Sequence, residues 1–146
     1  MLEHVVRVRL GIVAVAAATM VAGCGKDSPT TPTPTPSGPS FATQIQAEIL
    51  NPACVSCHTN DGRTPAAGLN LRSGSARAAL VGVPSTQKPG TPLVVASNPG
   101  GSYLVQKLEG AADIVGLRMP RNGPPYLSAA QVALIRLWIQ NGAPNN

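Results

Sequence analysis

Apolar residues follow a helical spacing in four stretches of the chain, which long polar or Gly- and Pro-rich segments separate. The four stretches are 40–50, 75–81, 102–109 and 129–141. In the first, Phe41, Ile45 and Ile49 recur every four residues and form one apolar stripe, which is typical of a helix with one buried face. Only residues 93–96 suggest an extended segment. The pattern therefore predicts an all-α domain of about four short helices joined by long loops.

Residues at the helix ends indicate where the first three helices begin and end. Asn51 precedes Pro52, and a residue before proline avoids the helical region, so we expect the first helix to end there. Ser75 and Ser102 stand where their side chains could cap the second and third helices.

The last helix carries the clearest signals. Ser128 followed by Gln131 matches a capping box, and Gly142 is a typical helix terminator. Its apolar side chains cover a broad arc made of Leu134, Ile135, Leu137, Trp138 and Ile139. An arc of this width has to be buried on more than one side. We expect Trp138 to pack against the first helix rather than to take part in chemistry.

Residues 1–23 predict a signal peptide that is removed from the folded protein. Arg7 and Arg9 form a positively charged start, and the apolar run at 10–22 is too short and wrongly flanked for a membrane-spanning helix. A short membrane anchor that remains uncleaved is the alternative.

A cysteine and a linker follow the signal peptide. Residues 21–24 read Val-Ala-Gly-Cys, which resembles the bacterial lipoprotein signal, in which the cysteine is lipidated and becomes the new N-terminus. Cys24 would then anchor the protein to a membrane; an unpaired thiol is the alternative. Residues 24–40 comprise this cysteine and a Thr- and Pro-rich linker, which would span up to roughly 50 Å as polyproline II. Simple disorder would give nearly the same spacer, and 41–146 remains as the folded domain.

The strongest chemical signal is the pattern Cys-x-x-Cys-His at residues 54–58, which is typical of covalent haem attachment. Cys54 and Cys57 would each add to one haem vinyl group, and His58 would supply a nitrogen to the iron. A redox dithiol, half of a zinc site and a plain disulfide are the alternatives. A zinc site needs a second ligand pair, which the sequence lacks, and a thioredoxin-like dithiol should follow a strand rather than a helix.

Few further iron ligands remain after export. The chain has two His and three Met. His4, Met1 and Met20 lie in the predicted signal peptide, so the mature protein keeps one histidine and one methionine, which is Met119. If the iron takes a second strong ligand from the protein, Met119 is the candidate, and ligation by His and Met raises the reduction potential. A surface methionine or a core filler is the alternative.

Charge and composition argue against several functional classes. The formal net charge is +5, but the Lys and Arg residues are scattered without interleaved aromatics, which is weak evidence for nucleic-acid binding. The carboxylates are scattered too, no Gly-rich phosphate loop of the usual form is present, and no histidine besides His58 remains to act as a general base. We therefore expect no enzyme activity and no small-molecule substrate.

Together these residues resemble class I c-type cytochromes, which ligate one haem with His and Met, and small bacterial cytochrome c-like domains in particular. The matching stretches are 54–58, 102–108, 119–120 and 138–143. The resemblance implies a cytochrome c-like fold around one covalent haem c per chain, with first and last helices that cross. Cys54 and Cys57 would be bonded to the haem. His58 would be the proximal ligand and Met119 the distal ligand. A proline carbonyl or similar group would accept the His58 proton, and the loop 62–69 is the place to look for it.

The function that follows is a membrane-tethered monohaem cytochrome that carries single electrons between redox partner proteins outside the cytoplasm. It would be a periplasmic or cell-surface lipoprotein of a bacterial cell envelope, and Gly25 after Cys24 favours the outer membrane under the enterobacterial sorting pattern. One alternative is a haem-based sensing module in which Met119 is labile. Another is a lipoprotein binding module whose two thiols form a disulfide.

Overall fold

The computed structural model describes residues 38–146. The predicted signal peptide, Cys24 and most of the predicted linker lie outside these residues. Pro39 is buried, and the Ser40 hydroxyl caps the first helix by accepting from the Thr43 N–H. The described domain thus includes the last residues of the Pro-rich segment.

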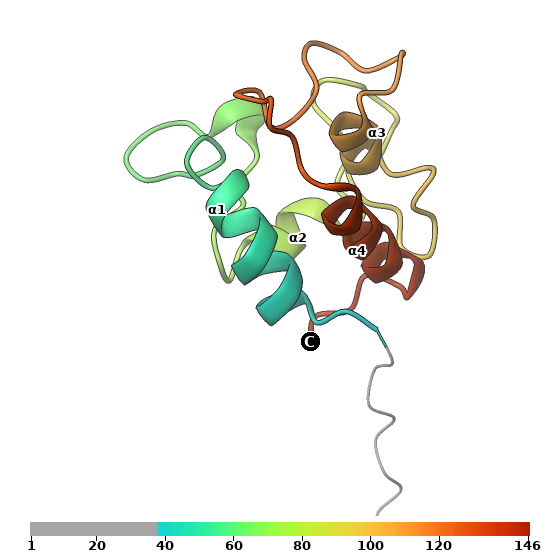
Figure 1. The fold of residues 1–146 in the computed structure, drawn as a ribbon. Helices are drawn as coiled ribbons and strands as arrows, with labels where there is room; N and C mark the ends of the chain where they lie inside the picture. The colour runs from blue at the N-terminus through green and yellow to red at the C-terminus, as the bar shows by residue number, and fades with distance from the viewer. Residues whose placement is uncertain (1–37) are drawn as a thin grey trace, which may run out of the picture. The chain divides into compact units, whose positions relative to one another are not determined.

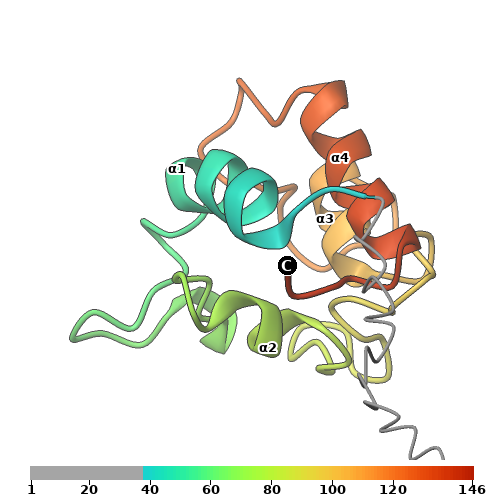
Figure 2. The ribbon, with the colours of Figure 1, turned by 90° about the horizontal axis from the view of Figure 1, so that it is seen from below.

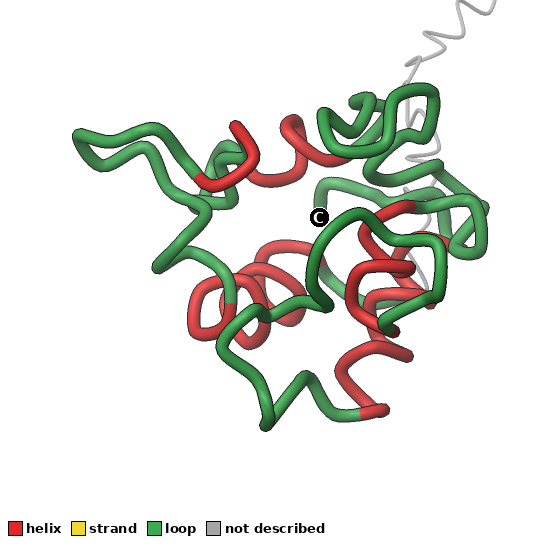
Figure 3. Tube along the Cα trace, turned by 90° about the horizontal axis from the view of Figure 1, so that it is seen from above, coloured by secondary structure: helices red, strands yellow, loops and turns green. Residues whose placement is uncertain are grey.

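Short helices and long loops make up the described chain (Figure 1). In chain order the helical segments are η1 (Phe41–Leu50), α1 (Asn51–Ala53), η2 (Ala66–Gly68), α2 (Ala76–Leu80), α3 (Tyr103–Glu109) and α4 (Ala129–Gln140). Residues 38–146 form no β-sheet, and only isolated bridges such as Val81 with Val94 join extended residues (Figure 3). The predicted all-α class is therefore confirmed for the part of the chain that the structure describes. No helix in this part is long and apolar enough to cross a membrane.

Pro52 does not end the first helix, contrary to the prediction from the sequence. η1 is a wide helix, in which the N–H of Asn51 bonds to the carbonyl of Gln46 five residues back. Asn51 keeps helical angles (φ −59°, ψ −53°), and the helix continues as α1. Pro52 lies in the first turn of α1, where a missing N–H costs little. The helix consequently runs up to Cys54, which is its C-terminal cap.

Two predicted serine caps are also wrong. The first two N–H groups of α3 bond to the main-chain carbonyls of Pro92 and Leu93, at 3.0 and 2.9 Å. These donors therefore need no side-chain acceptor. The Ser102 hydroxyl is buried and bonds instead to main-chain groups of the loop 95–98. Ser75 precedes α2 but its side chain makes no capping hydrogen bond.

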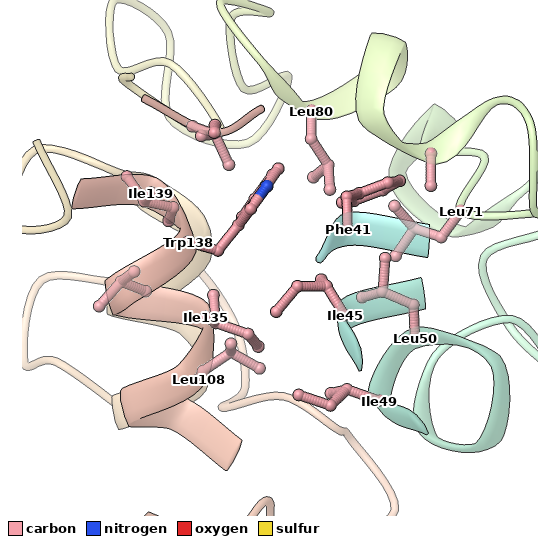
Figure 4. Close-up of a cluster of buried hydrophobic side chains, with 14 of the residues drawn as sticks. Phe41, Ile45, Ile49, Leu50, Leu71, Leu80, Leu108, Ile135, Trp138 and Ile139 are labelled. Atoms are coloured by element: carbon pink, nitrogen blue, oxygen red, sulfur yellow. The ribbon is translucent and has the colours of Figure 1, made fainter. Parts of the chain in front are cut away.

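The core lies where η1 and α4 cross (Figure 2). Figure 4 shows Phe41 and Ile45 of η1 facing Ile135 and Trp138 of α4. The rings of Phe41 and Trp138 are 5.1 Å apart between centroids and inclined by 33°. The Trp138 indole N–H donates to the carbonyl of Pro144 at 3.0 Å, so its polar atom is satisfied inside the core. The prediction that Trp138 packs against the first helix is confirmed.

The C-terminal residue closes the N-terminal end of η1. The Ala42 N–H donates to the Asn146 main-chain oxygen at 2.9 Å, and the Phe41 N–H donates to the Asn146 side-chain oxygen at 2.8 Å. Figure 1 shows the C-terminus beside the start of this helix. Donors that a helix leaves unpaired at its first turn are satisfied in this way by a residue from the other end of the domain.

α4 begins as predicted but buries less of its surface than predicted. The Ser128 hydroxyl accepts from the Gln131 N–H, and the Gln131 side-chain oxygen accepts from the Ser128 N–H, which confirms the capping box. The broad apolar arc is only partly covered, because Leu137 is 46% exposed. α4 packs against η1 and α3, and its remaining side faces solvent.

We expect Trp138→Ala to lower the free energy of unfolding of the protein by about 3–5 kcal/mol, because it leaves a cavity beside Phe41 at a fully buried position. Leu137→Ala, one residue earlier on α4 and half exposed, is the control and should cost no more than about 1 kcal/mol. Denaturant unfolding measures both. Equal losses for the two variants would contradict the packing described here.

Candidate functional site

The Cys-x-x-Cys-His segment forms one turn that follows directly from the first helix. The N–H of His58 bonds to the carbonyl of Cys54 at 2.9 Å, and the N–H of Cys57 bonds to the same carbonyl at 3.2 Å. Both cysteines are free thiols, Cys54 half-buried and Cys57 exposed. The turn therefore brings two thiols and an imidazole together within five residues.

Ala66 supplies the hydrogen-bond acceptor for His58. The imidazole Nδ1 lies 3.0 Å from the Ala66 carbonyl oxygen. A carbonyl can only accept, so Nδ1 carries the hydrogen, and Nε2 keeps the lone pair with which a neutral imidazole binds a metal. Ala66 follows Pro65 and lies in the loop 62–69, which the resemblance indicated as the place to look for an acceptor that the sequence did not identify.

Main-chain bonds hold that loop against the attachment turn. The Ala66 N–H donates to the Cys57 carbonyl at 3.1 Å, and the Leu71 N–H donates to the His58 carbonyl at 2.8 Å. Ala67 has a positive φ of 55°, which costs a residue with a Cβ on the order of 1–2 kcal/mol. The Thr86 hydroxyl donates to the Ala67 carbonyl at 3.1 Å. The strained bend is thus bonded on both sides, and it keeps the Ala66 carbonyl next to the imidazole.

A cavity of about 970 Å³ brings together all the side chains that the sequence analysis assigned to the haem. Cys54, Cys57 and His58 line it from the attachment turn, and Met119 lines it from the loop after α3. Its volume lies near the upper end of the range of roughly 300–1,000 Å³ typical of ligand sites. The fold therefore joins two segments that are far apart in the sequence.

Aliphatic side chains make up much of the cavity wall. The leucines that line it are Leu69, Leu71, Leu93, Leu104, Leu108 and Leu117. Residues of the segment 66–71 line this same cavity. Such a wall favours a large apolar ligand and excludes water from it.

Met119 is held by its main chain. It lies in a loop without helix, as predicted, and its N–H donates to the carbonyl of Lys107 at 2.9 Å. The Met119 side chain is half-buried and packs against the edge of the core. It therefore lines the cavity from a defined position in the fold.

Cys54 is not an activated thiol. Burial raises the pKa of the Cys54 thiol to about 11, and the neighbouring Cys57 adds to the effect. Cys54 also stands at the C-terminal end of a helix, where the partial negative charge disfavours a thiolate. A redox dithiol needs a lowered thiol pKa, so this environment favours the other interpretations of the motif.

Two features of the site were not assigned from the sequence. Lys107 is buried and lines the cavity, and Tyr103 lines it one helical turn earlier. Their spacing of four residues on α3 was the signal that could have placed them on one face. Within residues 38–146, no three His, Cys, Asp or Glu residues gather into a group that could hold a metal ion.

Comparison of the chain with protein-family models, with curated proteins and with solved structures finds no match. The sequence motifs and the geometry of the cavity are therefore the features that indicate a function.

Proposed function

We propose that this protein is a membrane-tethered monohaem c-type cytochrome that carries single electrons outside the cytoplasm. The observation that carries the proposal is that Cys54, Cys57, His58 and Met119 all line one large cavity with aliphatic walls. A covalent haem c needs two thiols, one neutral imidazole and, for a high potential, a thioether on the other side of the iron.

The residues present fit such a group. Leucine side chains offer an apolar surface to a porphyrin, and the cavity is large enough for a ligand of that class. The hydrogen bond from His58 to Ala66 selects the tautomer that a metal ligand requires. The protonated, half-buried Cys54 suits a residue that ends in a thioether rather than in a thiolate.

Each residue has a separate task in this proposal. Cys54 and Cys57 would hold the haem by thioether bonds, and His58, oriented by Ala66, would ligate the iron. Met119 would supply a thioether ligand to the same iron. The bound haem would supply an iron centre that accepts and releases one electron. The leucine wall would keep water away from it, and two protein ligands would leave no place for a substrate.

The envelope location rests on the N-terminal sequence. A lipid on Cys24 and a linker of up to roughly 50 Å would keep the domain near a membrane while allowing it to reach redox partners. This accords with c-type cytochromes being matured outside the cytoplasm in bacteria.

The first experiment tests haem attachment. Protein made in cells that mature c-type cytochromes should keep its haem stain on a denaturing gel, because thioether bonds survive unfolding. The variant with both Cys54→Ser and Cys57→Ser should show no stain. Wild-type protein that is compactly folded but colourless would refute the proposal.

Met119→Ala should leave the haem attached, lower the reduction potential and abolish the weak sulfur-to-iron absorption band, because the thioether ligand is lost. Val115→Ala, an exposed position in the same loop, is the control and should preserve the band and the potential. Redox titration and absorption spectra measure these effects. A prompt spectral shift when carbon monoxide is added to reduced wild-type protein at neutral pH would favour the sensing alternative.

Cys24→Ala should move the protein from the membrane fraction to the soluble fraction without changing its haem content, because the anchoring acyl chains are lost. Ser28→Ala, in the same segment, should stay with the membranes. Cell fractionation followed by haem staining measures both. Retention of Cys24→Ala in the membrane fraction would show that the anchor lies elsewhere.

A further inference from the structure

Lys107 is a buried cation to which the proposed function gives no task. Only 6% of its surface is exposed, and burial lowers the pKa of its ammonium group. Lysine is rarely buried to this extent, because removing the charge from water is costly unless hydrogen bonds replace the lost hydration. The partners that replace the water at Lys107 therefore indicate what the residue does.

Those partners belong to the loop that leads to Met119. The Lys107 ammonium donates to the main-chain carbonyl of Val115 at 2.8 Å and to that of Leu117 at 2.6 Å. The Lys107 carbonyl in turn accepts from the Met119 N–H at 2.9 Å. One residue of α3 thus binds the loop 115–119 at three points, and Lys107 and Met119 line the same cavity.

Further bonds from α3 reinforce this connection. The Tyr103 hydroxyl, one turn earlier, accepts from the Val115 N–H at 2.9 Å. The Arg118 side chain donates to the Leu108 carbonyl at 2.7 Å. Helix α3 therefore satisfies the polar main-chain groups of a loop that has no regular structure of its own.

Hydrophobic packing against the core holds this loop only at Met119. The side chains of Val115 and Leu117 are 48% and 60% exposed, so they contribute little to packing. Hydrogen bonds to a charged donor are stronger than neutral ones, and a buried donor left unsatisfied carries a full desolvation penalty. The two ammonium-to-carbonyl bonds are consequently the charge-assisted contacts that fix residues 115–117 on α3.

We propose that Lys107 is the positioning residue that holds Met119 at the cavity, in the place where its sulfur ligates the haem iron. This inference rests on the proposed function. Lys107 acts through the main chain of the loop 115–119, and its own amine is not a ligand while Met119 is bound.

The test uses haem-loaded protein with Lys107→Met, which removes the ammonium group and keeps the side-chain length. Loss of the bonds to Val115 and Leu117 should weaken the sulfur-to-iron absorption band at neutral pH. It should also speed carbon monoxide binding to the reduced protein by about tenfold or more, which corresponds to about 1.4 kcal/mol. Lys107→Arg, which can still donate to two carbonyls, should restore both readouts.

Arg72→Met is the control, because it removes a positive charge from a half-exposed side chain that pairs with Asp61 rather than with α3 or the loop 115–119. It should keep the band and the wild-type rate. Tyr103→Phe should give a smaller increase in rate, since it removes only the acceptor for the Val115 N–H. If Lys107→Met does not assemble with haem, Lys107→Leu provides the same comparison, because it also has no hydrogen-bond donor and has a shorter side chain.

The outcomes separate the two proposals. A wild-type band and rate in Lys107→Met or Lys107→Leu overturns the role of Lys107 and leaves the cytochrome proposal intact. Equal defects in Lys107→Met and Lys107→Arg also overturn it, because they would trace the effect to side-chain shape rather than to the bonds with the carbonyls. Wild-type protein without covalent haem removes the basis of both proposals.

Discussion

The contact between Phe41 and Trp138 is the interaction on which the rest of this small domain depends. It joins η1 to α4, and the segment with the thiols and the imidazole continues directly from the C-terminal end of the first helix. Asn146 adds hydrogen bonds, because its main-chain and side-chain oxygens accept from N–H groups in the first turn of η1. Because η1 and α1 form one continuous helix, fixing its start against α4 also fixes the direction in which Cys54 leaves it.

Loops make up much of the cavity wall, and main-chain hydrogen bonds between segments hold them. The carbonyls of Pro92 and Leu93 start α3, and α3 then anchors the loop that carries Met119. On the other side, the loop 66–71 is bonded to the attachment turn. In a chain this rich in Gly and Pro, short helices cannot satisfy all backbone groups by themselves, so neighbouring segments exchange bonds around the cavity.

A domain of this size buries a modest apolar core, and the aliphatic wall of the cavity lies beside that core. A covalently held porphyrin would pack against this wall. Under the proposed function the cofactor is thus part of the core as well as the redox centre, and binding and folding are coupled as they are in other small domains built around a prosthetic group or metal.

The sequence alone determined the helical class, the capping box at Ser128 and the identity of the candidate ligands, because these depend on residue spacing within a single turn or helix. Tertiary structure decided the features that depend on distant partners. Pro52 remains helical because it begins a new helical segment, and Ser102 does not cap because carbonyls of a distant loop occupy the helix donors. The acceptor for His58 and the bonds of Lys107 to the loop 115–119 also required the fold, since a main-chain carbonyl has no sequence signature and a lysine in a helix usually faces solvent.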